Sequence, residues 1–241
     1  MLIASDRHTP ADLELWSEYD SADRVHKVSE AKLLKSVDAI RSFRADYAGV
    51  SWGKDSVVLA HLIWLHSPQT PLVHIRQIPT GNPECLRVRD AFLSLFDVQY
   101  VEYTADYRGC GKSAMELEGK TDKIFYGNFQ SAGSRYHSGI RANESGGRAI
   151  RCRRYGLLTK NTSAPLAWWT SEDVFSYLAA HDLPIHPSYA MLGGGRWDRQ
   201  QIRVDEVGGF RGNQFGRSEW EQEYYGDVLR RVAIAAFKSQ P

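Results

Sequence analysis

The sequence predicts an α/β fold, with an open parallel sheet, helices on both faces and a C-terminal extension of helix and loops. Strand-like and helix-like segments alternate from Tyr47 onward, which is the pattern of parallel strands joined by crossover helices. The run 72–78 has the apolar character of a strand buried on both faces. A hydrophobic share of 42% with 24% charged residues is ordinary for a globular chain and sufficient for a core.

The length of 241 residues fits one domain with an appended lobe. We expect helices in 1–46, an α/β domain in 47–190, and loops with a final helix in 191–241. In the first part, Thr9 and Pro10 mark a helix start, because a threonine cap before a proline suits the first turn. A second helical periodicity extends over 21–44.

The elements of the α/β part follow from local patterns. Between 105 and 134 the periodicity weakens and glycines recur, so we expect short helices and loops there. Thr170 and Asp173 form a capping box at the start of a helix whose Trp169 and Tyr177 belong to the core. The expected strands are 47–50, 72–78, 98–104 and 136–140, and a final helix is expected at 218–237.

Charge and cysteine content narrow the classes of function. The net charge of +1 gives no overall attraction to nucleic acid or acidic membranes, although the arginines of 141–154 mark either a polyanion site or an exposed loop. Cys85, Cys110 and Cys152 are far apart, which argues against a disulfide scaffold and a self-contained zinc or iron–sulfur site. No run is long enough to cross a bilayer, so we expect a cytoplasmic protein without a membrane partner.

The stretch Val-Ser-Trp-Gly-Lys-Asp-Ser at 50–56 joins the first predicted strand to the next helix. Such a turn leaves backbone N–H groups free at the positive end of a helix, where they attract phosphate. Lys54 adds a charge, and Ser51 and Ser56 add hydroxyl donors. The loop is too short for the common G-x-x-x-x-G-K-[ST] motif, and its lysine precedes Asp55.

A second polar stretch follows the strand predicted at 136–140. Arg141 and Arg148 lie just beyond its carboxyl end, where open parallel sheets bind ligands. Their guanidinium groups suit phosphate or sulfate oxygens, and Glu144 can hold one of them in place. Taken alone, this stretch is equally typical of a surface salt-bridge cluster.

The 51–56 loop resembles the S-G-G-K-D-S pyrophosphate loop of the N-type ATP pyrophosphatases. The resemblance is to the branch of adenine nucleotide alpha hydrolase-like proteins that contains phosphoadenylylsulfate (PAPS) reductase, the small subunit of ATP sulfurylase, and DNA-phosphorothioation ATP pyrophosphatases. The family's residue types stand at every loop position except Trp52, whose role the sequence leaves open.

Three further segments resemble elements of the same family. The segment 80–84 is similar to D-T-G-x-x-F-P-E-T, with Pro79 where the family usually has aspartate. The segment 139–148 is similar to G-x-R-x-x-E-S-x-x-R, and 165–189 is similar to its P-L-x-x-W-x-x-x-D-V-x-x-Y element and the I-P-x-x-P-x-Y that follows. The resemblance implies a Rossmann-like sheet of the HUP type and a nucleotide-binding domain over 47–190.

The resemblance also implies an activity, cleavage of ATP at the α-phosphate with transfer of the adenylyl group to an acceptor, in sulfur or nucleic-acid modification chemistry. Lys54, Asp55, Arg141 and Arg148 are the expected catalytic residues, with the two arginines holding an anionic acceptor or the γ-phosphate. Mg²⁺ is the expected metal, with Asp55 as its candidate ligand. The expected nucleotide-binding residues are Ser51, Trp52, Gly53, Lys54, Asp55, Ser56, Thr80, Gly81, Gly139, Glu144 and Ser145.

Two alternatives stay open. The first is a sulfonucleotide reductase that acts on PAPS or its 3′-dephosphorylated form (APS) without an iron–sulfur cluster. The expected C-terminal cysteine motif is not seen after Cys152, which we interpret as non-catalytic. The second is a non-catalytic nucleotide-binding subunit of a modification complex. A partner protein or a second copy of the chain, and nucleic acid as the modification target, remain candidate partners beside the adenine nucleotide.

Overall fold

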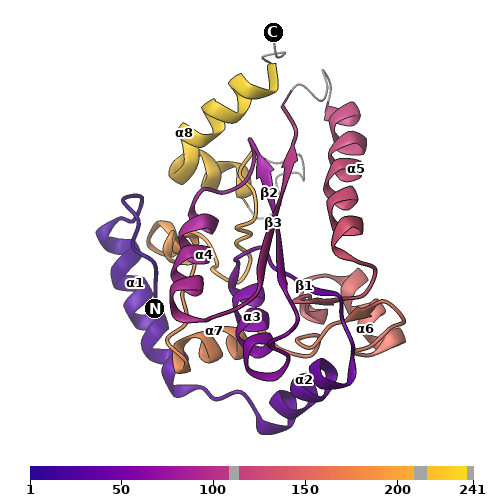
Figure 1. Ribbon diagram of the computed structural model, residues 1–241. Coiled ribbons are helices and arrows are strands. Elements are labelled where there is room, and N and C mark those ends of the chain that lie inside the picture. Colours follow the sequence, from indigo (N-terminus) through magenta and orange to yellow (C-terminus); the bar gives the residue numbers. More distant parts are fainter. Residues whose placement is uncertain (109–113, 209–215, 238–241) are drawn as a thin grey trace.

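The computed structural model describes the backbone of residues 1–108, 114–208 and 216–237, with the side chains of 114–122 and 236–237 excluded. At its centre is a parallel sheet of five strands in the order β3-β2-β1-β4-β5, with helices around it (Figure 1). The predicted fold class is therefore confirmed. The strands are β1 (Tyr47–Gly49), β2 (Leu72–Ile78), β3 (Tyr100–Asp106), β4 (Tyr136–Ser138) and β5 (Thr162–Ser163).

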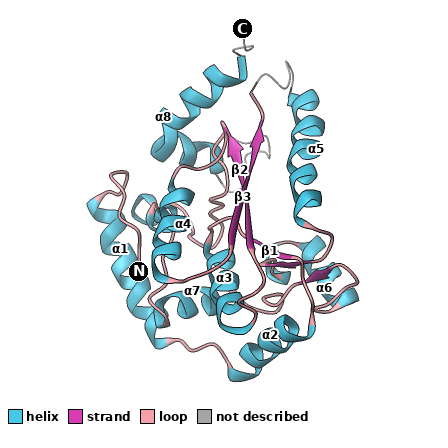
Figure 2. Ribbon diagram, viewed as in Figure 1, coloured by secondary structure: helices cyan, strands magenta, loops and turns pink. Residues whose placement is uncertain are grey.

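Helices connect and cover the strands (Figure 2). The α-helices are α1 (Pro10–Val25), α2 (Glu30–Ser42), α3 (Lys54–His66), α4 (Glu84–Leu95), α5 (Ala114–Ala132), α6 (Gly146–Tyr155), α7 (Ser171–Ala180) and α8 (Arg217–Phe237). Three short 3-10 turns complete the described part, η1 (Ala142–Glu144), η2 (Pro187–Ala190) and η3 (Gly193–Gly195). The final helix α8 was predicted within one residue of its observed start.

The N-terminal helices divide differently from the prediction. Thr9 and Asp12 form a capping box at the start of α1, as expected. The single helix predicted over 21–44 is wrong, because α1 continues to Val25 and α2 begins only at Glu30. The Ser29 side chain accepts a hydrogen bond from the Lys32 amide and so starts a new helix where periodicity alone indicated continuity.

The region 105–134 is also more regular than predicted. Strand β3 extends to Asp106, and α5 is a helix of 19 residues rather than short helices and loops. Ile124, Phe125 and Phe129 pack against a cluster formed by β2 and β3, and this tertiary burial outweighs the weak local pattern. Strand β5 was not predicted, since two residues carry no periodicity.

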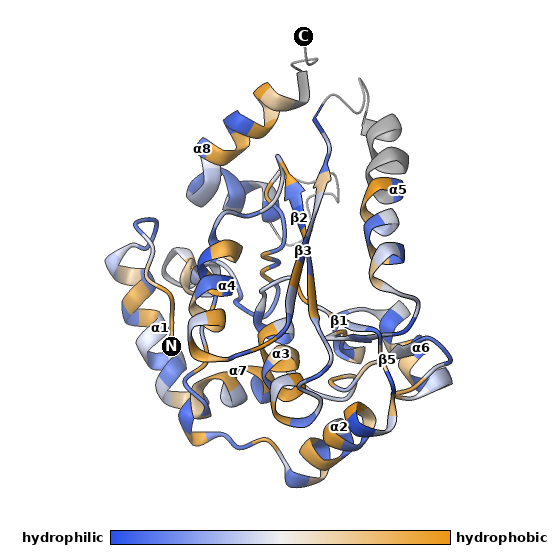
Figure 3. Ribbon diagram, viewed as in Figure 1, coloured by the Kyte–Doolittle hydropathy of each residue, from blue (hydrophilic) through white to orange (hydrophobic). Residues whose placement is uncertain are grey.

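The main hydrophobic core joins α3, α4 and α7 to the inner strands. Figure 3 shows α3 as a mostly hydrophobic helix within this core. Trp169 and Tyr177 are buried and Thr170 and Asp173 form the capping box of α7, which confirms those predictions. A smaller cluster joins α5 to β2 and β3.

The strand order determines where a ligand can bind. From β1 the chain winds to β2 and β3 on one side, and then returns to β4 and β5 on the other side. The carboxyl ends of β1 and β4 therefore border the point at which the winding direction reverses, where open α/β sheets hold their ligands. The 51–56 loop follows β1, and the 139–148 segment follows β4.

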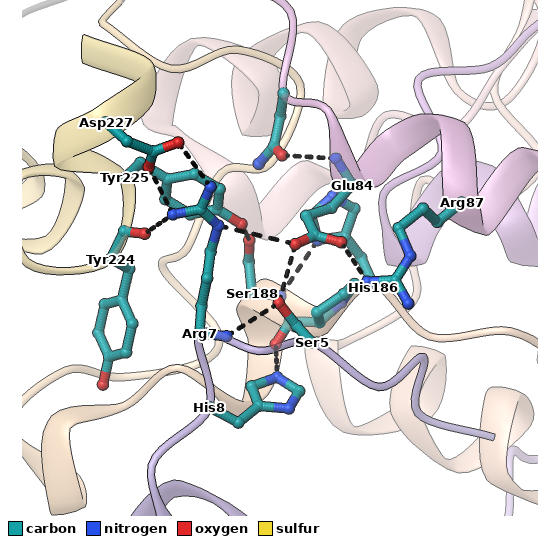
Figure 4. A network of polar contacts seen from close by, with 12 residues as sticks. Ser5, Arg7, His8, Glu84, Arg87, His186, Ser188, Tyr224, Tyr225 and Asp227 are labelled. Atoms are coloured by element: carbon teal, nitrogen blue, oxygen red, sulfur yellow. Dashed lines mark hydrogen bonds and ion pairs between the residues drawn. The ribbon is translucent and has the colours of Figure 1, made fainter. Parts of the chain in front are cut away.

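A group of charged residues fastens the N-terminal segment to the rest of the molecule (Figure 4). We call Ser5, Arg7, Glu84 and Asp227 the Arg7 network. Arg7 Nη1 lies 2.6 Å from Asp227 Oδ1 on α8, and Ser5 Oγ donates to Glu84 Oε1 on α4 at 2.8 Å. Arg7 Nε lies 3.8 Å from the same Glu84 oxygen. The network thus joins three segments distant in sequence. None of the helices in the described ranges is long and apolar enough to cross a membrane.

Candidate functional site

The 51–56 loop forms a tight turn at the start of α3. Gly53 is the N-cap of the helix and has no side chain to occupy the amide groups of the first turn. Ser56 Oγ donates to the Gly53 carbonyl at 3.0 Å and lies 3.4 Å from Ser51 Oγ. The Lys54 amide donates to the hydroxyl of Tyr189 at 3.1 Å. Local hydrogen bonds and Tyr189 therefore hold the loop in one conformation.

Two glycines are required by close approaches of other groups. A Cβ on Gly53 would lie 3.0 Å from Val204 Cγ2 and 3.1 Å from the Tyr189 hydroxyl. A Cβ on Gly139 would lie 3.3 Å from the carbonyl carbon and oxygen of Asp55. The turn after β4 thus packs directly against the loop after β1, and a larger residue at either glycine would separate them.

Trp52 directs its side chain into the core. Its φ of 64° lies in the left-handed region, which is uncommon for a bulky residue and shows that its surroundings determine the turn. The indole is fully buried, and its ring centroid lies 5.6 Å from that of Phe92 and 5.8 Å from that of Tyr100. Trp52 was predicted to contact the nucleotide, but its indole packs in the core and does not line the cavity described below. Only its backbone takes part in the turn.

Four side chains form what we call the loop cluster, namely Lys54, Asp55, Arg141 and Asn143. Lys54 Nζ lies 3.4 Å from Asp55 Oδ2, and Arg141 Nε donates to Asp55 Oδ1 at 2.5 Å. Arg141 Nη1 donates to Asn143 Oδ1 at 2.8 Å, and the arginine is 1% exposed. Both oxygens of Asp55 are thus engaged, and Arg141 clamps the 51–56 loop to the turn after β4.

The remaining residues of the 139–148 segment have distinct positions. Glu144 accepts a hydrogen bond from the Arg141 amide at 2.7 Å and forms an ion pair with Arg148, as expected for a residue that fixes a guanidinium. Ser145 caps α6 by accepting from the Arg148 amide at 3.2 Å. The Arg148 guanidinium is partly exposed and lines the cavity, whereas Arg141 is inaccessible from that side.

A cavity of about 670 Å³ opens beside the 51–56 loop, within the size range of small-molecule sites. One wall consists of Ser51, Gly53, Lys54, Asp55 and Ser56 with Gly139, Glu144 and Arg148. A second wall is aromatic and consists of Phe125, Tyr126 and Phe129 from α5, with Tyr136 from β4. The segment 202–205 also contributes to the lining.

A second cavity of about 340 Å³ adjoins the first. Both are lined by Lys54, Glu144, Ile202 and Arg203, so the side chains of 202–203 form part of the wall between them. Arg203 is exposed and forms no ion pair with the residues the structure describes. Lys54 and Arg203 are therefore the cations that can act on groups in both cavities.

Thr80 and Gly81 lie outside the lining of both cavities. The Thr80 carbonyl accepts a hydrogen bond from the Val207 amide at 2.7 Å, and Gly81 forms an isolated antiparallel bridge with Glu206. A Cβ on Gly81 would lie 2.5 Å from the Gln77 carbonyl oxygen, which explains the glycine. These two residues hold the 204–207 segment against the end of β2.

The cysteines with a described position are buried away from the cavity. Cys152 is the buried residue of α6 and packs against Ala164 and Ala167. Burial raises the pKa of the Cys85 thiol, which donates to the Val204 carbonyl at 3.2 Å. Neither residue lines either cavity. Cys110 lies outside the described residues, as does Arg211 with the glycines around it.

Two histidines beside the cavity are held neutral. Burial lowers the pKa of His137 to about 4, and neither ring nitrogen has a hydrogen-bond partner. Burial also lowers the pKa of His74, whose Nδ1 lies 3.0 Å from the Val50 carbonyl. The histidines therefore add no positive charge to the phosphate-binding wall at neutral pH.

A match to a family model shows to which protein family this chain belongs. The model of the phosphoadenosine phosphosulfate reductase domain matches residues 47–192, from the first strand of the sheet to the end of the segment that holds Tyr189. The chain belongs to the PAPS reductase domain family. The 51–56 loop and Arg141 lie within the matched residues, and so does the lining of the main cavity apart from the segment 202–205.

Curated relatives of this family are similar over most of the chain. A PAPS reductase of Xanthomonas axonopodis pv. citri is 26% identical over 199 residues, which cover 73% of this chain and 76% of the relative. A PAPS reductase of Xanthomonas oryzae pv. oryzae is 25% identical over the same length and shares of both chains.

Solved structures with a similar arrangement are more distant. A PAPS reductase from Candida auris in complex with phosphate is 13% identical with a TM-score of 0.44, over 67% of this chain and 91% of that one. A U34-tRNA thiolase from Methanococcus maripaludis with a [4Fe-4S] cluster is 14% identical with a TM-score of 0.46, over 88% of this chain and 80% of that one.

Several residues that line the two cavities were not among the site residues expected from the sequence. Arg203 and Asp205 line the main cavity from a part of the chain in which only loops and a final helix were expected. Three residues of the aromatic wall come from α5, in a region where short helices and loops were expected rather than one long helix. Tyr189 was not among the expected site residues, yet its hydroxyl accepts a hydrogen bond from the Lys54 amide. Only the resemblance at 165–189 pointed to Tyr189 at all.

Proposed function

We propose that this member of the PAPS reductase domain family is an adenylyltransferase of the ATP pyrophosphatase type, which cleaves ATP between the α- and β-phosphates. The observation that carries the proposal is the position of Lys54. Lys54 is a lining residue of both cavities and begins α3 within the 51–56 loop, and its Nζ lies 3.4 Å from Asp55 Oδ2. An ammonium group, a helix N-terminus and two serine hydroxyls in one wall suit a leaving pyrophosphate.

The two walls of the main cavity suit the two ends of the nucleotide. The aromatic residues of α5 and β4 offer an apolar surface for an adenine ring. Ser51, Lys54 and Ser56, with the amides of the first turn of α3, would hold the β- and γ-phosphates. Arg148, paired with Glu144 but partly exposed, would contact an outer phosphate.

The acceptor would approach from the second cavity. Its nucleophilic atom would attack the α-phosphorus and form a new bond to it, while the bond between that phosphorus and the α,β-bridging oxygen breaks and pyrophosphate leaves. Lys54 and Arg203 line both cavities and would stabilise the charge that develops between them. Asp55 would position Lys54, and Arg141 would position Asp55, through the contacts of the loop cluster.

The residues fit a magnesium ion that arrives with the nucleotide. The described residues contain no group of three or more histidine, cysteine, aspartate or glutamate side chains that would hold a metal by themselves. Mg²⁺ commonly binds through one or two carboxylates, substrate phosphates and water, and when bound it neutralises charge on the phosphates. Asp205 lines the main cavity without an ion pair to a described residue, whereas both oxygens of Asp55 are engaged. Asp205 would therefore hold the ion.

PAPS reduction is the second candidate, and the similarity to curated PAPS reductases at 25–26% identity favours it. The same anion-binding wall, with Lys54 and Arg148, would then hold the sulfonucleotide. Reduction needs a thiolate that attacks the sulfur. Cys152 and Cys85 are buried and line neither cavity, so the described cysteines supply no such thiolate at the site.

A paired assay separates the candidates. Purified protein is incubated with Mg·ATP, and pyrophosphate is measured with and without acceptors of several classes. In parallel it is incubated with PAPS, thioredoxin and a thioredoxin-reducing system, and sulfite is measured. Pyrophosphate without sulfite supports adenylyl transfer. Sulfite without pyrophosphate supports reduction, and ATP binding without either product supports a nucleotide-binding subunit.

A further inference from the structure

Helix α6 and the turn after it carry a concentration of positive charge of which the proposed chemistry uses only Arg148. The residues between Ser145 and Ser171 include no aspartate or glutamate, whereas they include Arg148, Arg151, Arg153, Arg154 and Lys160. Only Arg148 has a carboxylate partner, Glu144, among the described residues. The other four basic side chains are partly or fully exposed. An overall charge of +1 conceals this local excess.

Apolar side chains stand exposed among these cations. Ile150 is 66% exposed and Tyr155 is 52% exposed. The Arg154 guanidinium carbon lies 5.2 Å from the centroid of the Tyr155 ring, so a planar cation already covers one face of this ring. Exposed aromatic rings beside arginines are the elements with which proteins stack the bases of single-stranded nucleic acid.

The inner face of α6 is already occupied. Cys152, the buried residue of the helix, packs with Ala164 and Ala167 and with Leu157. On the exposed part of the helix, Ile150 and Tyr155 are separated by arginines, so the helix offers no continuous apolar stripe for insertion into a bilayer, which an interfacial membrane helix requires. A polyanion that lies along the outer face is the occupant that the charges fit best.

The helix leads directly to the main cavity. Arg148 lines that cavity from the first turn of α6, and Arg151 follows one turn later on the same helix. The ten residues of α6 extend for about 15 Å at 1.5 Å per residue. A strand bound along α6 would therefore pass the mouth of the cavity.

We propose that the exposed basic surface of α6 and of the turn that follows it, formed by Arg151, Arg153, Arg154 and Tyr155 of the helix and by Lys160, is a docking surface for single-stranded nucleic acid. Phosphates of the strand contact the arginines and Lys160, and a base stacks on Tyr155. Because this surface leads to the main cavity, we infer that the acceptor is a polynucleotide. This inference about the acceptor rests on the proposed adenylyl transfer, whereas the docking surface itself does not.

The test measures binding without any nucleotide substrate, so its result is independent of the proposed activity. Fluorescence anisotropy records the binding of labelled single-stranded DNA and RNA of about 20 nucleotides, of a duplex of equal length, and of vesicles with anionic lipid. A variant with Arg151→Ala, Arg153→Ala and Arg154→Ala removes three charges. Its matched control, with Lys27→Ala, Lys35→Ala and Arg230→Ala, removes three exposed charges elsewhere.

The expected result is binding of a single strand by the wild type and the control, at least about tenfold weaker in the α6 variant at low salt. The slope of log affinity against log salt should fall by about 2 in that variant, since each phosphate contact on a single strand contributes about 0.7. Replacing the three arginines by lysine should retain most of the binding, and Tyr155→Ala should weaken it severalfold.

Three results would overturn the proposal. One is no binding of any single strand at about 50 mM salt, where contacts with phosphate are strong. Another is equal weakening in the α6 variant and its matched control, which would show a general charge effect. The last is binding to anionic vesicles, or to the duplex, without binding to any single strand.

Discussion

The loop cluster and the Arg7 network use the same chemistry in different surroundings. In each, an arginine joins a carboxylate to segments that are distant in sequence. Arg141 pairs with Asp55 across the ends of β1 and β4, whereas Arg7 pairs with Asp227 and approaches Glu84 between the N-terminal segment, α8 and α4 (Figure 4). The loop cluster borders two cavities, and the Arg7 network borders neither.

This difference shows what turns a structural ion pair into part of a site. Arg7 is partly exposed, and the carboxylates around it satisfy its charge, so its pairs stabilise the fold. Arg141 is buried and fixes the position of Asp55. Asp55 in turn pairs with Lys54, which lines both cavities. A substitution in the Arg7 network should therefore change stability alone. A substitution in the loop cluster should change activity as well.

The largest effect is expected for Lys54→Ala. The rate constant kcat/KM for pyrophosphate release from ATP should fall by about 1,000-fold, because a preorganised charge on the leaving group is lost. Activity assays measure this fall, and circular dichroism should show an unchanged fold. Lys35→Ala, on the exposed side of α2, is the matched control and should retain full activity. Equal turnover in both variants would contradict the assignment of the loop.

Arg141→Ala should damage stability and activity together. Removing one partner of a buried ion pair typically lowers the free energy of unfolding by about 3 kcal/mol. Asp55 would keep only Lys54, and the loop would lose its clamp to the turn after β4. Urea unfolding measures the first effect and kcat/KM the second. A variant that is less stable but fully active would show that the clamp serves the fold alone.

Arg7→Ala should lower the free energy of unfolding by about 1 kcal/mol or less, because its ion pairs are partly exposed and therefore screened by solvent. At a temperature where the variant is folded, kcat/KM for ATP should stay within about twofold of the wild type, since the network borders no cavity. Urea unfolding and the pyrophosphate assay provide the two readings. A loss of activity as large as that of Arg141→Ala would remove the distinction between the clusters.

His137→Phe should change how stability depends on pH. The pKa of this histidine is about 4 in the folded chain and about 6.5 when unfolded, so the neutral form is favoured by folding. Its contribution to stability is complete above pH 6.5 and decreases as the pH falls toward 4. Between these values the variant should lose about 2–3 kcal/mol less stability than the wild type, because the pKa differs by about 2.5 between the two states at about 1.36 kcal/mol per unit. Burial also lowers the pKa values of His61 and His186, and these two histidines are present in both proteins. An equal loss of stability in the variant and the wild type as the pH falls would contradict this expectation.

The sequence was sufficient for the parts of the molecule that depend on local chemistry. The turn at 51–56 and the capping box of Thr170 and Asp173 rest on residue types at fixed spacing, and the structure has both where they were expected. The parallel sheet followed from the alternation of strands and helices. These features need no knowledge of distant contacts.

The features that sequence could not supply depend on packing. Helix α5 is stabilised by contacts of Phe125 and Phe129 with β2 and β3, which no local pattern contains. The direction of the Trp52 indole depends on space between Phe92 and Tyr100. Arg203 resembled any solvated arginine in the sequence, and only the fold brings it beside Lys54 at the junction of two cavities.

Calorimetric titration with ATP and AMP tests the central claim most directly, namely that the 51–56 loop holds the pyrophosphate part of a triphosphate. The wild type should bind Mg·ATP at least about 100-fold more tightly than AMP, a difference of about 2.7 kcal/mol. Lys54→Ala should remove most of that difference while leaving the affinity for AMP unchanged. Equal affinities for ATP and AMP in the wild type, or an undiminished preference for ATP in Lys54→Ala, would contradict the account.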